Sequence, residues 1–76
     1  MIDRKTMGAW IKRRREAAKL TQAALGARVK LTQSMVHRLE RGGAPMSFER
    51  WTAFCEAFRV DEQRAIREII REARAA

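Results

Sequence analysis

The dipeptide Thr-Gln occurs twice in the sequence, eleven residues apart, at Thr21 and at Thr32. Threonine is a preferred N-cap, because its hydroxyl oxygen accepts a hydrogen bond from a backbone N–H of the first helical turn. The pattern predicts a short helix from Thr21 through Arg28 and a second from Gln33 to Arg41, with only three or four residues between them. Two short helices joined by a tight turn form a helix-turn-helix, and this feature constrains the fold more than any other.

Composition favours an all-α fold. Only one Pro and four Gly interrupt the 76 residues. Ala, Arg, Glu, Leu and Met dominate, which is typical of helices. A chain of this length supports one small core, so we expect residues 1–76 to form a single domain. With one Cys and one His, neither an intramolecular disulfide nor a structural zinc site is expected. We therefore predict a compact domain of five helices that is stabilised by packing, without a metal ion or a cofactor.

Three further helices are predicted from caps and apolar spacing. The first begins with Thr6 as N-cap and ends near Leu20, the fourth is capped by Ser47, and the fifth by Asp61. Gly42 is expected to adopt the left-handed conformation that ends a helix. The predicted buried faces are Met7, Trp10, Ile11 and Ala18 in the first helix and Phe48, Trp51, Phe54, Cys55 and Phe58 in the fourth. The fifth helix carries a narrow apolar stripe of Ile66, Ile69, Ile70 and Ala73.

The charge pattern points to a polyanionic partner. Seventeen Lys and Arg against nine Asp and Glu give a formal charge of +8, and nucleic acid is the first candidate. The sequence has no apolar run as long as a signal peptide core or the ~20 residues of a membrane span, so we expect a cytoplasmic protein without membrane contact. It also has no Ser/His/Asp or Cys/His pairing, no Gly-rich phosphate loop and no paired carboxylates in an evident cleft, which argues against an enzyme.

The second helix of the predicted pair has two different faces. Its polar residues fall within an arc of roughly 140° at the helical period of about 100° per residue. The opposite side carries the apolar Met35, Val36 and Leu39. Gln can pair with the adenine edge and Arg with the guanine edge in the major groove, while Ser and His serve several acceptors. The polar arc, which consists of residue types that discriminate base edges, contains Gln33, Ser34, His37, Arg38 and Arg41.

The segments MGAWI, LTQAAL, LTQSMVHRLERG and PMSFERWTAFCEAFRV occur in this order between Met7 and Val60, which is most of the chain. Together they resemble the phage-repressor-like (Xre-type) helix-turn-helix family. The resemblance implies a compact five-helix, lambda-repressor-like domain in which helices 2 and 3 form the helix-turn-helix. Stand-alone members of this kind resemble Cro-like repressors and the controller proteins of restriction-modification systems.

The resemblance also implies roles for individual residues. Gln33, Ser34 and Arg38 match positions that read bases, with His37 beside them. Arg15 and Glu40 match a pair that forms a buried salt bridge between helix 1 and the recognition helix. The expected phosphate contacts are Thr21, Gln22, Lys30, Thr32 and Arg41.

The sequence departs from the family pattern at several positions. Lys19 and Lys30 stand where the family often has glycine, and a left-handed conformation costs about 1–2 kcal/mol for other residues. Either these turns differ locally, or the strain is accepted because the lysines face phosphates. Gly26 replaces a common alanine inside helix 2. Arg14 occupies a position that is usually apolar, so helix 1 is rotated or the arginine extends its charged head to solvent.

The last segment, residues 61–76, raises the question of oligomeric state. Its stripe of Ile66, Ile69, Ile70 and Ala73 packs on the core or forms a two-fold dimer interface. We favour the dimer, since a single recognition helix would have little specificity over bulk DNA. The leading hypothesis is a sequence-specific transcriptional regulator that binds a palindromic double-stranded DNA operator as a homodimer.

Two alternatives belong to other classes. In the first, the domain is an antitoxin-type module that binds a protein partner such as a toxin and autoregulates its own operon. In the second, it is a basic amphipathic protein of the membrane surface, which the alternation of acidic residues with arginine along the last helix disfavours.

Overall fold

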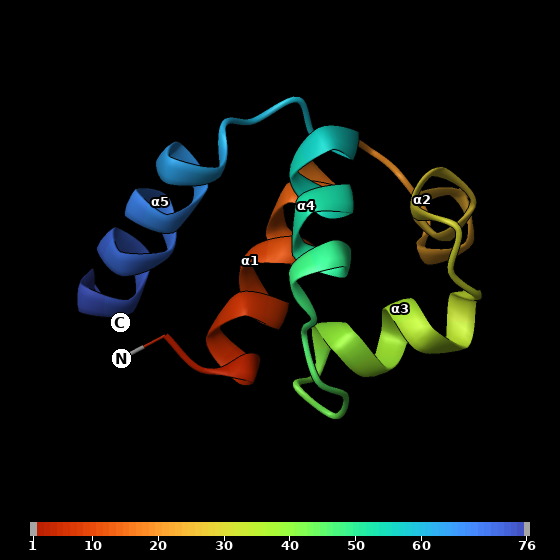
Figure 1. Cartoon of the computed structure of the whole chain (residues 1–76), viewed down its shortest axis with the longest axis horizontal. Helices are drawn as coiled ribbons and strands as arrows, with labels where there is room; N and C mark the ends of the chain where they lie inside the picture. The colour runs from red at the N-terminus through yellow and green to blue at the C-terminus, as the bar shows by residue number, and fades with distance from the viewer. Residues whose placement is uncertain (1, 76) are drawn as a thin grey trace.

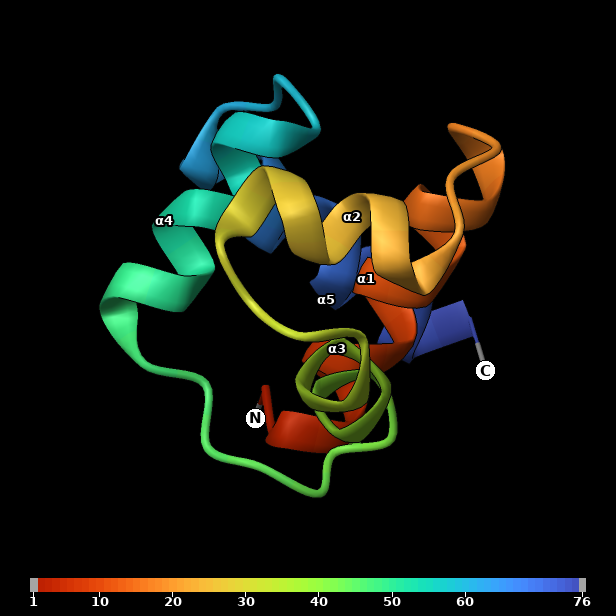
Figure 2. The ribbon, with the colours of Figure 1, turned by 90° about the vertical axis from the view of Figure 1, so that its right-hand side faces the viewer.

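The computed structural model describes residues 2–75, which form five α-helices and no strand (Figure 1). The helices are α1 (Arg4–Ala17), α2 (Gln22–Val29), α3 (Gln33–Glu40), α4 (Phe48–Ala57) and α5 (Glu62–Ala75). The predicted all-α fold with a helix-turn-helix at α2 and α3 is confirmed. Figures 1 and 2 show α2 and α3 at one end of the molecule and α5 at the other, with α1 and α4 between them. Within the described residues, no helix is long and apolar enough to cross a membrane.

Most of the predicted N-caps make the expected hydrogen bond. Each cap accepts from the backbone N–H three residues further on, and this satisfies a donor that would otherwise lack a partner. The donor-to-acceptor distances are 3.0 Å for Ala24 to Thr21, 3.1 Å for Met35 to Thr32, 3.1 Å for Arg50 to Ser47 and 3.1 Å for Arg64 to Asp61.

The predicted start of α1 at a Thr6 cap is wrong. Asp3 is the N-cap, and its carboxylate accepts the backbone N–H of Thr6 at 2.8 Å. Hydrogen bonding from Thr6 lowers the pKa of Asp3, because it favours the ionised carboxylate. Thr6 therefore lies inside the first turn of α1, which begins at Arg4.

The core is centred on Trp10 of α1. Its ring centroid lies 5.2 Å from that of Trp51 and 5.8 Å from that of Phe58, both in tilted or edge-on geometries that aromatic pairs favour. The side chains that are almost completely buried come from all five helices and include Trp10, Phe54, Ile11, Leu25, Leu39, Ile69, Val36 and Cys55.

Two residues of the predicted core are exposed. Phe48 is 75% exposed, because at the start of α4 its side chain lines a groove between α4 and α5 instead of the core. Ala18 is also exposed, because α1 ends at Ala17 and Ala18 is its C-cap. The helical period therefore overestimates the buried stripe at the ends of these helices.

The turns keep their left-handed geometry without glycine. Lys19 and Lys30 have φ angles of 58° and 60°, and Arg59 after α4 has 54°, while Gly42 has the predicted positive φ of 75°. The strain of about 1–2 kcal/mol at each non-glycine residue is thus accepted. Their positive charges lie beside the negative ends of helix dipoles, which offsets part of that strain. Gly26 lies inside α2 and faces the turn that leads to α3. A Cβ at this position would lie 2.5 Å from the Leu31 carbonyl oxygen in that turn, which explains the glycine.

Polar contacts attach α5 to α1. Arg14 donates to both carboxylate oxygens of Glu68 at 2.7 and 2.6 Å, and the Trp10 indole N–H donates to the same group at 3.2 Å. The Arg14 guanidinium also lies over the Trp10 ring, 5.6 Å from its centroid. These hydrogen bonds, chiefly those from Arg14, lower the pKa of Glu68. Arg14 therefore stays in the interface between α1 and α5, where its charge is paired.

Helix α1 crosses the end of α3 at Gly8. A Cβ on Gly8 would lie 2.3 Å from the Leu39 carbonyl oxygen and 2.6 Å from that of Glu40. Both atoms belong to the backbone and cannot rotate away. The close approach of the two helices therefore requires glycine.

We expect Gly8→Ala to lower the free energy of unfolding by about 1–3 kcal/mol, because the added methyl group forces α1 away from α3. Urea unfolding followed by circular dichroism measures the change. Gly43→Ala is the matched control: its nearest atom would be the Arg38 carbonyl oxygen at 3.5 Å, an ordinary contact. Equal stability of the two variants would contradict the close approach.

Candidate nucleic-acid interface

Helix α3 has the two faces that the sequence predicts. Val36 and Leu39 are buried and Met35 is half-buried against the body of the domain. The opposite side, here called the polar face of α3, is exposed and consists of Gln33, Ser34, His37, Arg38 and Arg41. This placement follows from the amphipathic period of an eight-residue helix that packs on α1 and α2.

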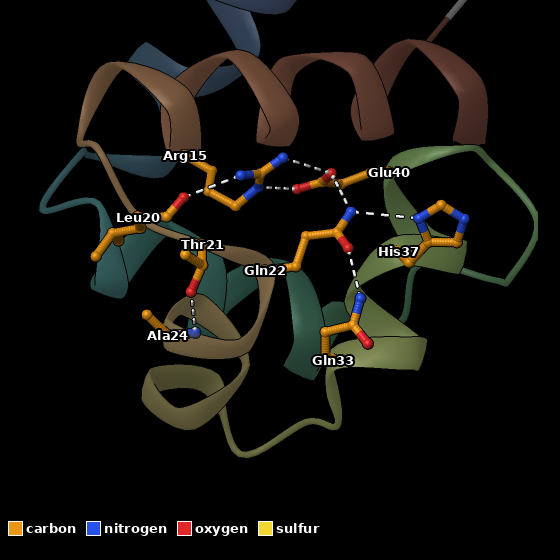
Figure 3. Close-up of polar contacts among 8 residues, drawn as sticks. All are labelled: Arg15, Leu20, Thr21, Gln22, Ala24, Gln33, His37 and Glu40. Carbon is orange, nitrogen blue, oxygen red and sulfur yellow. Dashed lines mark hydrogen bonds and ion pairs between the residues drawn. The ribbon is translucent and has the colours of Figure 1, made fainter.

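The predicted salt bridge between α1 and α3 is present and buried. Arg15 Nε donates to Glu40 Oε2 at 2.6 Å and Arg15 Nη2 donates to Oε1 at 3.2 Å (Figure 3). The side chains are only 12% and 2% exposed. Arg15 Nη1 donates in addition to the Leu20 carbonyl oxygen at 2.9 Å, and the bonds to Glu40 raise the pKa of Arg15. This two-pronged pair fixes the end of α3 against α1.

Gln22 extends this salt bridge toward the polar face of α3. Its amide nitrogen donates to Glu40 Oε1 at 2.9 Å and lies 3.3 Å from His37 Nδ1. Its amide oxygen accepts from Gln33 Nε2 at 2.8 Å (Figure 3). Both the nitrogen and the oxygen of this amide therefore have protein partners. The sequence predicted Gln22 as a phosphate contact, whereas here its side chain belongs to the internal polar network.

The network orients the amide of Gln33. Because Gln33 Nε2 donates to Gln22, the orientation of the Gln33 amide is fixed, and its oxygen and second N–H stay available for other partners. An acceptor and a donor side by side match the N6 and N7 groups of adenine. No signal in the sequence distinguishes this internal role of Gln22 from a direct contact with a ligand.

Basic and donor groups surround the polar face of α3. Thr21, Lys30 and Thr32 are exposed, as is Arg41 at the other end of α3. The threonine caps occupy one backbone N–H each, and the other N–H groups of the first turns of α2 and α3 remain suited to anions. Arg38 makes one long hydrogen bond, 3.4 Å to the Gly43 carbonyl oxygen, and keeps its other donors. All the predicted base and phosphate contacts therefore lie at one end of the molecule.

The predicted dimer contacts lie at the opposite end, on α5, and one of them is wrong. Ile69 is 0% exposed in the protomer, so it has no area to bury against a second chain and belongs to the core. Ile66 and Ile70 are half-buried and Ala73 is exposed. Phe48, which was expected in the core, lines a groove with Trp51 and Ile66 beside this surface. In the described part of the chain, no three His, Cys, Asp or Glu side chains come together as metal ligands would.

Known proteins share this fold. Residues 6–66 match the model of a family described as a helix-turn-helix domain. Two crystal structures of the clp gene regulator ClgR from Corynebacterium glutamicum are similar in fold, each at 21% sequence identity over 95% of this chain. One has a TM-score of 0.84 over 94% of the ClgR chain, and the other has 0.86 over 77%. No curated protein sequence matches the chain.

We expect Arg15→Met to lower the free energy of unfolding by about 3–5 kcal/mol, because it leaves the buried Glu40 carboxylate without its cation. The double variant Arg15→Met, Glu40→Met removes both charges and should be more stable than Arg15→Met alone. Urea unfolding of both single variants and the double variant measures the coupling. A double variant as unstable as the sum of the two single changes would show that the pair is not coupled.

Proposed function

The chain belongs to the helix-turn-helix domain family, and on this premise we propose that it is a sequence-specific regulator of transcription that inserts α3 into the major groove of double-stranded DNA. The observation that carries the proposal is the exposed polar face of α3. Its first side chain, Gln33, is oriented by hydrogen bonds that lead through Gln22 to the buried ion pair of Arg15 and Glu40. A preoriented amide binds a base edge without first losing conformational freedom.

Base contacts are assigned by hydrogen-bonding capacity. Gln33 pairs with adenine, since its free amide oxygen and N–H match adenine N6 and N7. Arg38 pairs with guanine O6 and N7, and Ser34 and His37 make the neighbouring contacts. These four side chains define a short recognition sequence on one half of the operator.

Phosphate contacts hold α3 in register. Lys30 and Thr32 flank the turn before α3, Thr21 and the backbone N–H groups at the start of α2 form an anion-binding helix end, and Arg41 lies beyond the base contacts. The charge of +8 adds attraction to the whole backbone of the duplex. We expect binding that falls steeply with salt but retains a sequence-dependent part.

A homodimer supplies the remaining specificity. The dimer contact is assigned to the outer surface of α5, where Ile66 and Ile70 are half-buried and Ala73 is exposed, next to the groove that Phe48 and Ile66 line. The protomer is 30 Å long. Two protomers related by a two-fold axis at this surface can place their α3 helices about 34 Å apart, one turn of DNA, because each α3 then lies only about 17 Å from the axis, which is within the length of a protomer. A palindromic operator follows from that symmetry.

Selection of bound sequences from a random duplex pool tests the proposal. We expect a two-fold symmetric consensus and a preference of at least ~10³ over scrambled DNA. Gln33→Ala and Arg38→Ala should each weaken binding to this operator by about 1–3 kcal/mol and relax the preference at one base pair.

Lys30→Gly provides the control for these two variants, because glycine accommodates the positive φ at this position. We expect it to weaken binding to all sequences alike and to reduce the salt slope by about 1. Unchanged operator preference in both alanine variants would contradict the recognition role of α3. Equal binding to all sequences would leave only charge attraction.

We expect Ile66→Glu with Ile70→Glu to convert the dimer to a monomer that remains helical, because both side chains are partly exposed in the protomer. Sedimentation and circular dichroism measure the two properties. Ile69→Ala is the contrasting variant: it should lower stability by about 2–5 kcal/mol through a core cavity. A wild-type monomer at high micromolar concentration would rule out the dimer and direct attention to another protein partner for this surface.

A further inference from the structure

His37 is the only histidine of the chain, and one of its ring nitrogens faces the internal polar network. His37 Nδ1 lies 3.3 Å from Gln22 Nε2. The imidazole itself is exposed on the polar face of α3, next to the base contacts assigned above. Whether Gln22 offers His37 Nδ1 a donor or an acceptor therefore decides whether the exposed Nε2 of the ring can donate to a ligand or accept from it.

The orientation of the Gln22 amide is dictated by Glu40. A carboxylate paired with an arginine acts as a hydrogen-bond acceptor, and both oxygens of Glu40 accept from Arg15. The Gln22 group at 2.9 Å from Glu40 must therefore be the NH2 and not the carbonyl oxygen. The Gln22 oxygen then faces Gln33, which donates to it at 2.8 Å.

It follows that His37 Nδ1 accepts. A neutral imidazole that accepts at Nδ1 carries its proton on Nε2, so the exposed end of the ring is a hydrogen-bond donor. A protonated ring carries hydrogen on both nitrogens, and its Nδ1–H would face the Gln22 NH2. Protonation thus removes the contact that holds the ring in place.

We propose that His37 is a donor to guanine N7, held in this state by the chain from Arg15 through Glu40 and Gln22, and that protonation of His37 releases the ring and lowers sequence discrimination. The proposal rests on the proposed function. Guanine suits a lone donor because it presents two adjacent acceptors, N7 and O6, whereas adenine places its N6 amino group beside N7 and cytosine presents a donor.

The charged groups around the ring do not retain it once it is protonated. Its charged neighbours are Arg38 and Glu40 on α3 and Arg41 directly after it, and α1 contributes Arg15 through the ion pair. Helix α2 carries Arg28 as its one charged residue, near its far end. Glu40 already accepts from Arg15 at both oxygens and from Gln22 at one. A protonated ring therefore turns to solvent or to a DNA phosphate, which carries no sequence information.

Replacement of single guanines by 7-deazaguanine in the selected operator tests the contact, since it removes N7 alone. We expect one position in each half-site at which the replacement weakens wild-type binding about three- to tenfold, the range of one hydrogen bond. The same replacement should leave the affinity of His37→Ala unchanged. Equal sensitivity of wild type and His37→Ala at every guanine would overturn the assignment.

The pH dependence tests the protonation step. Histidine changes charge between about pH 5 and 8, so we compare operator with scrambled duplex at pH 8.0 and at pH 5.5. For wild type, the operator preference should fall at the lower pH by about the same three- to tenfold, while binding to the scrambled duplex does not weaken. His37→Gln, which has an amide donor and does not titrate, should keep a constant preference.

The outcomes separate this inference from the proposed function. A wild-type preference that is strong but independent of pH, or a fall that His37→Gln shares, would overturn the role of His37 and leave the DNA-binding function intact. An absence of preference at both pH values would overturn the proposed function and this inference with it. The ring-nitrogen NMR spectrum of the single histidine provides an independent check. We expect the fraction of the neutral ring that carries its proton on Nε2 to be lower in Gln22→Ala than in wild type.

Discussion

The ion pair between Arg15 and Glu40 is the contact on which the geometry of the candidate interface depends. Its two charges are nearly excluded from water, so leaving either one without its partner would be costly. The pair joins α1 to the end of α3 beside Gly8, where the two backbones are too close for any side chain. It also fixes the Gln22 amide, which in turn orients Gln33 and contacts His37. A structural salt bridge thereby determines which donors and acceptors the exposed face presents.

The turns show a second compromise between stability and charge. Lys19, Lys30 and Arg59 adopt a conformation that glycine would adopt with less strain. Each places a cation beside a helix C-terminus, where the dipole favours it. At Lys30 the cation also lies in the turn of the helix-turn-helix, close to the candidate interface. Greater stability would be available from glycine there, at the expense of positive charge where a polyanion is expected.

Much of the fold and of the site was predictable from local patterns. Thr21, Thr32 and Ser47 act as the expected caps, since capping depends on neighbouring residues only. The polar face of α3 follows from its helical period. Errors arose where a pattern fits two places or where a helix ends. Asp3 and Thr6 are both good caps, and the structure uses Asp3. The apolar stripe of α4 extends beyond the core at Phe48, whereas Ile69 of α5, which was predicted as a dimer contact, lies within the core. The partners of Gln22 lie eleven, fifteen and eighteen residues away in α3, so local patterns carry no information about them.

The sequence by itself determined that the chain is helical, where four of its five helices are capped, and which side of α3 is polar, because each of these depends on residues within a turn or two of one another. The tertiary structure alone decided which of several suitable side chains are buried, which amide faces the Glu40 carboxylate, and how the ring of His37 is held. Those choices are made by contacts between helices. Burial and hydrogen-bond direction depend on the distance between elements, and the order of residues along the chain does not contain that distance.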